Sequence, residues 1–165
     1  MLFRSIPLSK KYTLAFNTEL GYGKGFGGKP YPIFKNFFGG GLGSVRGFEQ
    51  GTLGPLSNVR NTNPVQQLNI GGNQSFAFNA EFITPFPGAG NDRTLRMFGF
   101  FDVGNVANSE VAGSPGLFSD LRASVGVGLS WISPVGPLRF AIATPIRKQP
   151  QDKIQRFQFQ IGTPF

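Results

Sequence analysis

One arginine in a glycine-rich stretch is the residue with the clearest chemical potential in this chain. Arg46 lies in the string Gly43-Ser44-Val45-Arg46-Gly47-Phe48-Glu49. Its guanidinium presents donors in a fixed fork that matches a carboxylate with two parallel hydrogen bonds. If the loop around it is enclosed, the charge needs such partners, because an unpaired buried charge is costly. The flanking glycines permit a tight turn that would aim the side chain.

The composition excludes much other chemistry. The chain has no histidine and no cysteine, so most catalytic and zinc-binding groups, thiolate nucleophiles and disulfides are absent. An acid–base site can be assembled on paper from Ser44, Glu81 and Asp102, but an arginine between the two acids would hold both of them ionised. We therefore expect no enzymatic activity, no cofactor and no bound metal.

The elements that must position Arg46 and the acids show the two-residue period of β-strands. In residues 74–84, apolar Phe76, Phe78 and Phe82 fall on one face, and Asn79 and Glu81 fall on the other. The first face suits lipid and the second suits water. The same alternation predicts further strands at residues 11–23, 95–106, 121–133, 137–146 and 154–162, and a weaker one at residues 2–8, which Pro7 disfavours. Strand 95–106 is the least regular, because Phe98 and Phe100 would face the water-filled side.

Composition favours a membrane barrel over a soluble core or a helical membrane protein. The chain has 24 glycines and 19 phenylalanines, a mean hydropathy near zero, and no run near the ~18 apolar residues that a spanning helix needs. Without such a helix, only a closed barrel satisfies every backbone group in lipid. We predict an all-β fold, an antiparallel transmembrane β-barrel, present here as a partial barrel of six or seven strands. Open strand edges would promote self-association.

The predicted connections alternate in length, which orients the barrel. Tight turns such as Pro134-Val135-Gly136 fit the periplasmic side, whereas the long segments 24–73 and 107–120 fit the extracellular side. The connection 85–94 is long for a periplasmic turn. Segment 24–73 carries many apolar and aromatic residues that are costly to leave in water, so we expect it to fold into the lumen.

Strand parity also suggests partners for Arg46. It places Glu81 and Asp102 on the lumenal faces of the two strands that follow the loop, and Glu19 on the strand before it. The alternative is a solvent-exposed arginine in a flexible loop.

The net charge of +8 raises the question of a nucleic-acid partner. The basic residues are scattered, however, and several pairs such as Lys10-Lys11 and Arg147-Lys148 fall in predicted turns. We expect no nucleic-acid binding, and contact with acidic lipid headgroups or lipopolysaccharide instead. The first residues, Met1-Leu2-Phe3-Arg4-Ser5, do not form a secretory signal, so we expect residues 1–165 to be a fragment of a longer exported protein.

Several separate stretches resemble the BamA family of outer-membrane barrel-assembly proteins, within the bacterial surface antigen superfamily. Together they cover almost the whole chain in family order. They are Val45-Arg46-Gly47-Phe48, Gly51-Thr52-Leu53-Gly54-Pro55, Ala80-Glu81-Phe82-Ile83-Thr84-Pro85, Phe101-Asp102-Val103-Gly104-Asn105-Val106, Ser133-Pro134-Val135-Gly136-Pro137-Leu138, and Phe157-Gln158-Phe159-Gln160-Ile161-Gly162 with the terminal Phe165.

The resemblance implies that residues 1–165 are the C-terminal portion of an outer-membrane β-barrel. It also implies a location in the bacterial outer membrane and a non-enzymatic role in the assembly and insertion of β-barrel proteins. It implies that the loop motif Val45, Arg46, Gly47 and Phe48 folds inward, and that Arg46 pairs with Glu81 and Asp102. Unfolded barrel proteins would be clients, and accessory assembly lipoproteins would bind through the parent chain.

The resemblance also concerns the last strand, residues 154–165. Its alternating apolar residues and terminal aromatic resemble the signal that assembly machinery recognises in clients, and its end resembles one side of a weakly paired seam. The residues concerned are Phe157, Phe159, Ile161, Gly162 and Phe165.

Two other functions remain open at the level of sequence. One is a transporter of the same superfamily, which exports a protein client through the lumen in two-partner secretion or autotransporter assembly. The other is a passive porin in which segment 24–73 constricts a pore. A large, steady conductance that is unaffected by Arg46→Ala would favour the porin.

Overall fold

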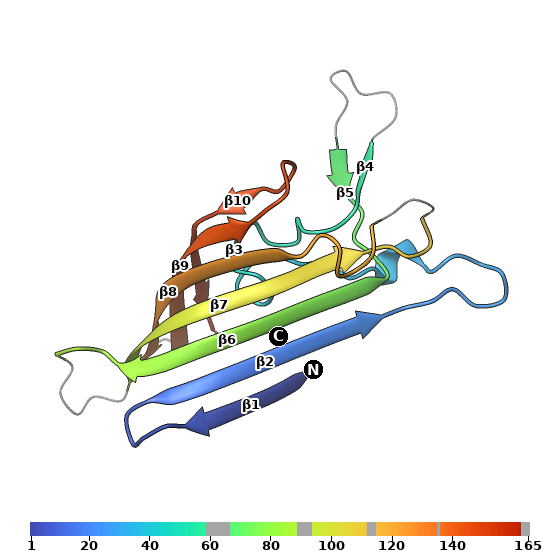
Figure 1. Ribbon diagram of the computed structural model, residues 1–165. Helices are drawn as coiled ribbons and strands as arrows, with labels where there is room; N and C mark the ends of the chain where they lie inside the picture. The colour runs from blue at the N-terminus through green and yellow to red at the C-terminus, as the bar shows by residue number, and fades with distance from the viewer. Residues whose placement is uncertain (59–66, 89–93, 112–114, 135, 163–165) are drawn as a thin grey trace.

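The computed structural model describes residues 1–58, 67–88, 94–111, 115–134 and 136–162. Seven strands form one antiparallel sheet in the order β1-β2-β6-β7-β8-β9-β11 (Figure 1). They are β1 (Leu2–Pro7), β2 (Thr13–Tyr22), β6 (Gln74–Pro85), β7 (Leu95–Ala107), β8 (Arg122–Ser133), β9 (Gly136–Arg147) and β11 (Phe157–Ile161). The prediction of an all-β, antiparallel fold with six or seven wall strands is confirmed, and the number is seven. The sheet curls without closing into a barrel, so β1 and β11 are its two edges.

The long segment between β2 and β6 has its own secondary structure. Its described residues include the 3₁₀ turn η1 (Ile33–Lys35) and the short strands β3 (Gly47–Phe48), β4 (Leu56–Asn58) and β5 (Gln67–Asn69). β4 pairs with β5, and two isolated bridges join Phe37 to Gly72 and Gly39 to Leu53. Among the residues described, no helix is long and apolar enough to cross a membrane. The described residues of segment 24–73 are held by backbone hydrogen bonds among themselves, between β4 and β5 and at the two bridges, as well as by the sheet.

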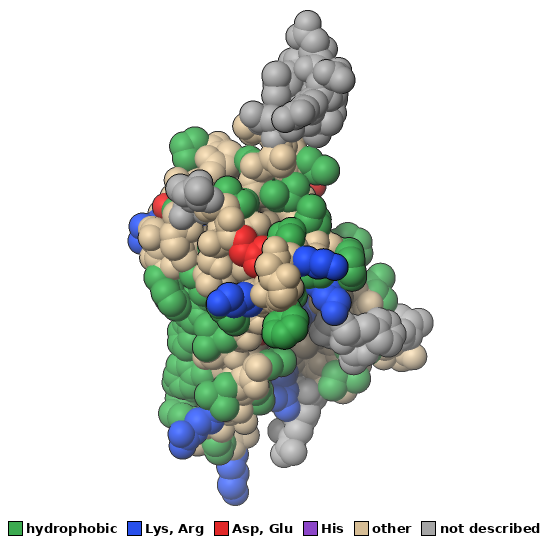
Figure 2. Space-filling view, turned by 90° about the vertical axis from the view of Figure 1, so that its right-hand side faces the viewer, with side chains coloured by type: hydrophobic (Ala, Val, Ile, Leu, Met, Phe, Trp, Pro, Cys, Tyr) green, Lys and Arg blue, Asp and Glu red, His purple; other side chains and the backbone are tan. Residues whose placement is uncertain are grey.

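The two faces of the sheet differ as the two-residue period predicts. Hydrophobic side chains gather along one side of the molecule, seen at the left of the space-filling view (Figure 2). Exposed large apolar residues of the wall include Leu20, Tyr22, Phe82, Phe101, Val125, Val127, Trp131, Ile142, Phe157, Phe159 and Ile161. This arrangement matches the lipid-facing surface of a membrane barrel.

The opposite face is packed where the aromatic residues of β7 meet the small residues of β8 and β9. Phe98 pairs in register with Gly128, and Phe100 with Gly126. A Cβ at Gly128 would come within 2.4 Å of the Phe98 ring, and one at Gly126 within 2.5 Å of the Phe100 ring. The glycines therefore leave room for both rings to lie across β8, which explains how two phenylalanines face the interior.

The last strand differs from its prediction. A continuous strand over 154–162 is wrong, because residues 154 and 155 form a separate strand, β10 (Ile154–Gln155), which pairs with β3 of the long segment and not with β9. β11 then pairs with β9, and Gly162, with φ +87°, donates its N–H to the carbonyl of Pro137 at 2.8 Å. Phe165 and Val135 lie outside the described residues. The break arises because the docked loop offers residues 154 and 155 another backbone partner.

Candidate functional site

Arg46 is held on the interior face of the sheet by two carboxylates. Its side chain is 1% exposed. Nε and Nη2 donate to the two oxygens of Asp102, each at 2.6 Å, and the Arg46 main-chain N–H donates to Asp102 at 3.0 Å. Nη1 donates to Glu81. Glu81 belongs to β6 and Asp102 to β7, so one guanidinium bridges two neighbouring strands. Glu19, the third candidate, is an exposed residue of β2.

Asn79 completes the hydrogen bonding of the buried acid. Its amide donates to Asp102 at 2.9 Å and to the main-chain carbonyl of Ser44 at 2.6 Å. Asp102 is 0% exposed, so each of its oxygens depends on protein donors. The amide therefore fixes the carboxylate and the loop backbone at the same time.

Aromatic rings form the floor beneath the guanidinium. The Cζ of Arg46 lies 3.7 Å from the centroid of Phe100 and 5.8 Å from that of Phe98. A guanidinium over an aromatic face gains cation–π attraction, and more so where water is excluded. The two phenylalanines that departed from the alternation therefore belong to the site.

Arg139 of β9 is a site residue that the sequence reasoning missed. It donates to Glu81 at 2.5 Å, and its Cζ lies 4.5 Å from the centroid of Phe98. The cluster thus holds two arginines and two acids, and its formal charges cancel. Arg139 shares the parity of Ala141 and Ala143 on β9, which both face inward, and this parity was available from the sequence.

The residues around Arg46 fit the loop to the wall. Val45, Phe48 and Leu53 form a cluster that is 0% exposed. Gly47 has φ +88°, and a Cβ there would lie 3.0 Å from the Cβ of Ala143, so this position favours glycine both for conformation and for space. The motif residues therefore seat the loop closely against β9.

The apolar residues of the last strand lie elsewhere. Phe157, Phe159 and Ile161 are exposed on the outer face, with the two phenylalanine rings stacked at 6.4 Å. Gln158, which the prediction did not single out, points inward and is 5% exposed. The structure therefore brings the outward residues together with each other, and not with Arg46.

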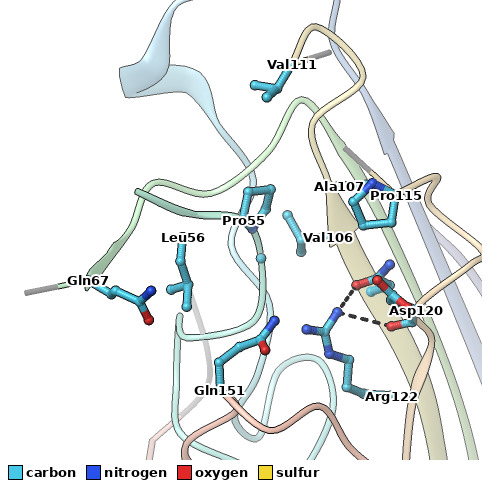
Figure 3. Close-up of a pocket in the computed structure, with 12 residues that line it drawn as sticks. Pro55, Leu56, Gln67, Val106, Ala107, Val111, Pro115, Asp120, Arg122 and Gln151 are labelled. Carbon is cyan, nitrogen blue, oxygen red and sulfur yellow. Dashed lines mark hydrogen bonds between the residues drawn. The ribbon is translucent and has the colours of Figure 1, made fainter. Parts of the chain in front are cut away.

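A second buried ion pair lies at the end of the sheet from which the long segment leaves. Arg122 donates to Asp152 through Nε and Nη2, and through Nη1 to the side chain of Asn105 and the carbonyl of Asp120. It faces a pocket of about 420 Å³ between the long segment and the segment after β7 (Figure 3). The inward parity of Arg122 at the start of β8 was visible in the sequence, whereas its distant partners were not.

Glu110 ties the first part of the long segment to the turn that follows β7. Its carboxylate accepts the main-chain N–H of Tyr31 at 2.7 Å and that of Gly25 at 2.9 Å. These backbone donors, Tyr31 first, stabilise the ionised form and lower the pKa of Glu110 below its ordinary value. The contact therefore depends on the charge of one exposed carboxylate.

Together these contacts form a clamp between the loop and the sheet. The two acids of the cluster accept hydrogen bonds from two arginines, one amide and one backbone N–H, so both carboxylates serve as hydrogen-bond acceptors. Arg46 carries the loop, and β6 and β7 carry the acids. The arrangement fastens the loop in one defined position on the inner face of the sheet.

A curved antiparallel sheet with an apolar outer face, and with an arginine-bearing loop docked on its inner face, defines a class of barrel-wall proteins. Within that class the chain belongs to the Omp85 superfamily, because the model of the Omp85 superfamily domain matches residues 3–165.

Known proteins of similar sequence and structure support this membership. The chain is 41% identical to the outer membrane protein assembly factor BamA of Neisseria meningitidis serogroup B, over 96% of this chain and 22% of that protein. It is 29% identical to a SAM50-like protein of Drosophila melanogaster, over 81% of this chain and 28% of that protein. The crystal structure of BamA from Haemophilus ducreyi lacking POTRA domains 1–3 matches with a TM-score of 0.84 and 33% identity, over 95% of this chain and 32% of that one. The chain spans about a fifth of the Neisseria relative.

Proposed function

We propose that the chain acts, in the bacterial outer membrane, in the assembly and insertion of β-barrel proteins, without covalent chemistry. The observation that carries the proposal is the clamp of Arg46 on Glu81 and Asp102, which docks a long loop inside a barrel wall similar to that of BamA. The role is that of a scaffold, because these acids serve as hydrogen-bond acceptors for the loop.

The clients in this proposal are unfolded barrel proteins. Backbone groups along a strand edge can pair with an incoming strand, which gives affinity without a specific sequence. The apolar outer face fits the acyl chains of outer-membrane lipids, and the net positive charge fits acidic headgroups and lipopolysaccharide. Accessory lipoproteins would act through the complete protein.

A depletion experiment tests the proposal. Cells depleted of the native protein receive wild type, Arg46→Ala, or the control Glu49→Gln, which removes only an exposed ion pair to Lys153 at 3.9 Å. We expect Arg46→Ala to lower the amount of folded, heat-modifiable barrel proteins in the outer membrane, and Glu49→Gln to leave it unchanged. Normal barrel levels with loss of one secreted protein would overturn the proposal in favour of a transporter. Normal levels with only altered conductance would favour a porin.

A further inference from the structure

We propose that the docked loop and the start of the last strand form one coupled unit, and that Gln158 is the positioning residue that couples them. The inference rests on the proposed function, because it assigns to the Arg46 loop a second task within the same clamp. That task is to hold residues 153–158 in place.

The first support is a backbone ladder between the loop and the chain that enters the last strand. Ile154 is the register partner of Phe48, and Gln155 that of Gly47. The main-chain N–H of Glu49 donates to the carbonyl of Lys153 at 2.9 Å and extends the ladder by one residue. The loop thus takes the place that β9 would otherwise fill beside residues 154 and 155.

The second support is the side chain of Gln158, which lies in β11, after the break between β10 and β11, and hydrogen-bonds to the same loop residues. Its Nε2 donates to the main-chain carbonyl of Phe48 at 2.6 Å, and its Oε1 accepts the N–H of Gly47 at 3.4 Å. Both ends of the amide therefore serve the backbone of the loop motif. Because Gln158 is 5% exposed, loss of the amide would leave buried backbone groups of the loop without this partner.

The third support is an ion pair in the turn that immediately precedes β10. Asp152 accepts hydrogen bonds from Arg122 of β8, with the ion pair at 3.0 Å, and from the N–H of Gln149 at 2.7 Å. Both charged side chains are at least 95% buried. This pair fixes the turn immediately before residues 153–155, so the chain is held by Arg122 of β8 just before β10 and by the loop along β10.

The coupling follows from adjacency in the chain. Arg46 is fastened to β6 and β7, and the next two residues, Gly47 and Phe48, are fastened to β10 and Gln158. The loop is therefore a clasp across the inside of the wall, from its central strands to its last strand. When Arg46 leaves its acids, the backbone partner of residues 154 and 155 leaves with it.

Cysteine cross-linking tests the clasp, because the chain has no native cysteine. Glu49→Cys and Lys153→Cys create a pair at exposed, adjacent positions of the ladder, in the complete protein within native outer-membrane vesicles. Cross-linking by a mild oxidant is followed as a gel shift. We expect Gln158→Leu to slow cross-linking about fivefold or more, because it removes the side-chain acceptor of the Gly47 N–H and leaves the Phe48 carbonyl with only the Gly41 N–H, at 3.1 Å, of its two donors named here. Gln158→Glu, which keeps the size but cannot donate to a carbonyl, should slow it too.

Gln160→Leu is the matched control, since Gln160 has the same parity and type on the same strand, and it should leave the rate unchanged. Only samples whose barrel shows normal heat-modifiable mobility are compared. Unchanged rates in both Gln158 variants would overturn the inference. So would an unchanged rate in Arg46→Ala, because the ladder would then be independent of the clamp. If Arg46→Ala slows cross-linking while barrel proteins still assemble normally, the clasp stands and the proposed function fails.

Discussion

Removing the Arg46 guanidinium should undock the loop while the wall persists. In Arg46→Ala, Asp102 loses two side-chain hydrogen bonds and its ion-pair partner, and it keeps the amide of Asn79 and the main-chain N–H of residue 46. Since Arg46 is 1% and Asp102 0% exposed, the figure for a dry site applies, which is about 3 to 5 kcal/mol for a buried charge that loses its partner. Glu81 contributes less, because it is 17% exposed and retains Arg139.

That free energy acts on the equilibrium between docked and undocked loop. At about 1.4 kcal/mol for each factor of ten, the undocked population should rise by about two to three and a half powers of ten. The seven-stranded sheet keeps its ladders, so the heat-modifiable mobility of the barrel should persist. Arg46→Ala should thus undock the loop without unfolding the sheet.

A single cysteine measures the undocked population. Leu53 is 0% exposed and packs with Val45 and Phe48, so Leu53→Cys is protected from a maleimide while the loop is docked. Where opening and closing are fast, the labelling rate follows the open population. We expect a rise of at least about a hundredfold on adding Arg46→Ala, and no change at Ser57→Cys, an exposed position of the same segment. Labelling of Leu53→Cys at the wild-type rate in Arg46→Ala would refute the reasoning.

Three further predictions concern the surroundings of the clamp. Arg139→Ala should raise the labelling of Leu53→Cys by only about tenfold or less, because Arg139 is 38% exposed and leaves Glu81 with its other arginine; a larger rise than in Arg46→Ala would contradict this. Gly126→Ala should lower the thermal unfolding temperature and loosen the loop, since a Cβ there meets backbone at 2.2 Å, whereas Gly99→Ala, with nothing within 4 Å, should change neither. The lowered pKa of Glu110 means that its contact is complete above the ordinary carboxyl pKa and is lost as pH falls through the lowered value. The protection of the Tyr31 and Gly25 N–H groups against hydrogen exchange, relative to their intrinsic rates at the same pH, should therefore fall at acid pH and lose this pH dependence in Glu110→Gln.

The strands and their faces were predictable because the two-residue period is a local property. β2, β6, β7, β8 and β9 each begin and end within two residues of the predicted bounds. The break between β10 and β11 was not predictable in the same way. Residues 156–162 alternate, whereas Ile154 and Gln155 depart from that alternation. The departure does not indicate which partner these two residues take, because that is decided by the distant Gly47 and Phe48. The period of a strand does not indicate which of two neighbouring segments its backbone will pair with.

The candidate site was predictable to the extent that strand parity determines which side chains lie on the inner face of the sheet. Parity reduced the partners of Arg46 to three acids, and the structure brings Glu81 and Asp102 to it while Glu19 stays exposed. Arg139 was not predicted, although it shares the inward parity of its strand, because strand parity alone does not indicate which second cation reaches Glu81 across the sheet.

The apparent fault in the pattern of strand 95–106 carried information. Within strand 95–106 alone, two inward phenylalanines break the expected pattern. Within β8 alone, the two glycines give no sign of a special role. In register they are complementary, because Phe98 lies over Gly128 and Phe100 over Gly126, and together they make the apolar floor on which the Arg46 guanidinium rests. A large residue that breaks alternation, opposite a glycine on the neighbouring strand, therefore predicts something packed across both strands. Here the packed group is the arginine of the loop, and the same rule can be applied to the amino-acid sequences of other barrel walls.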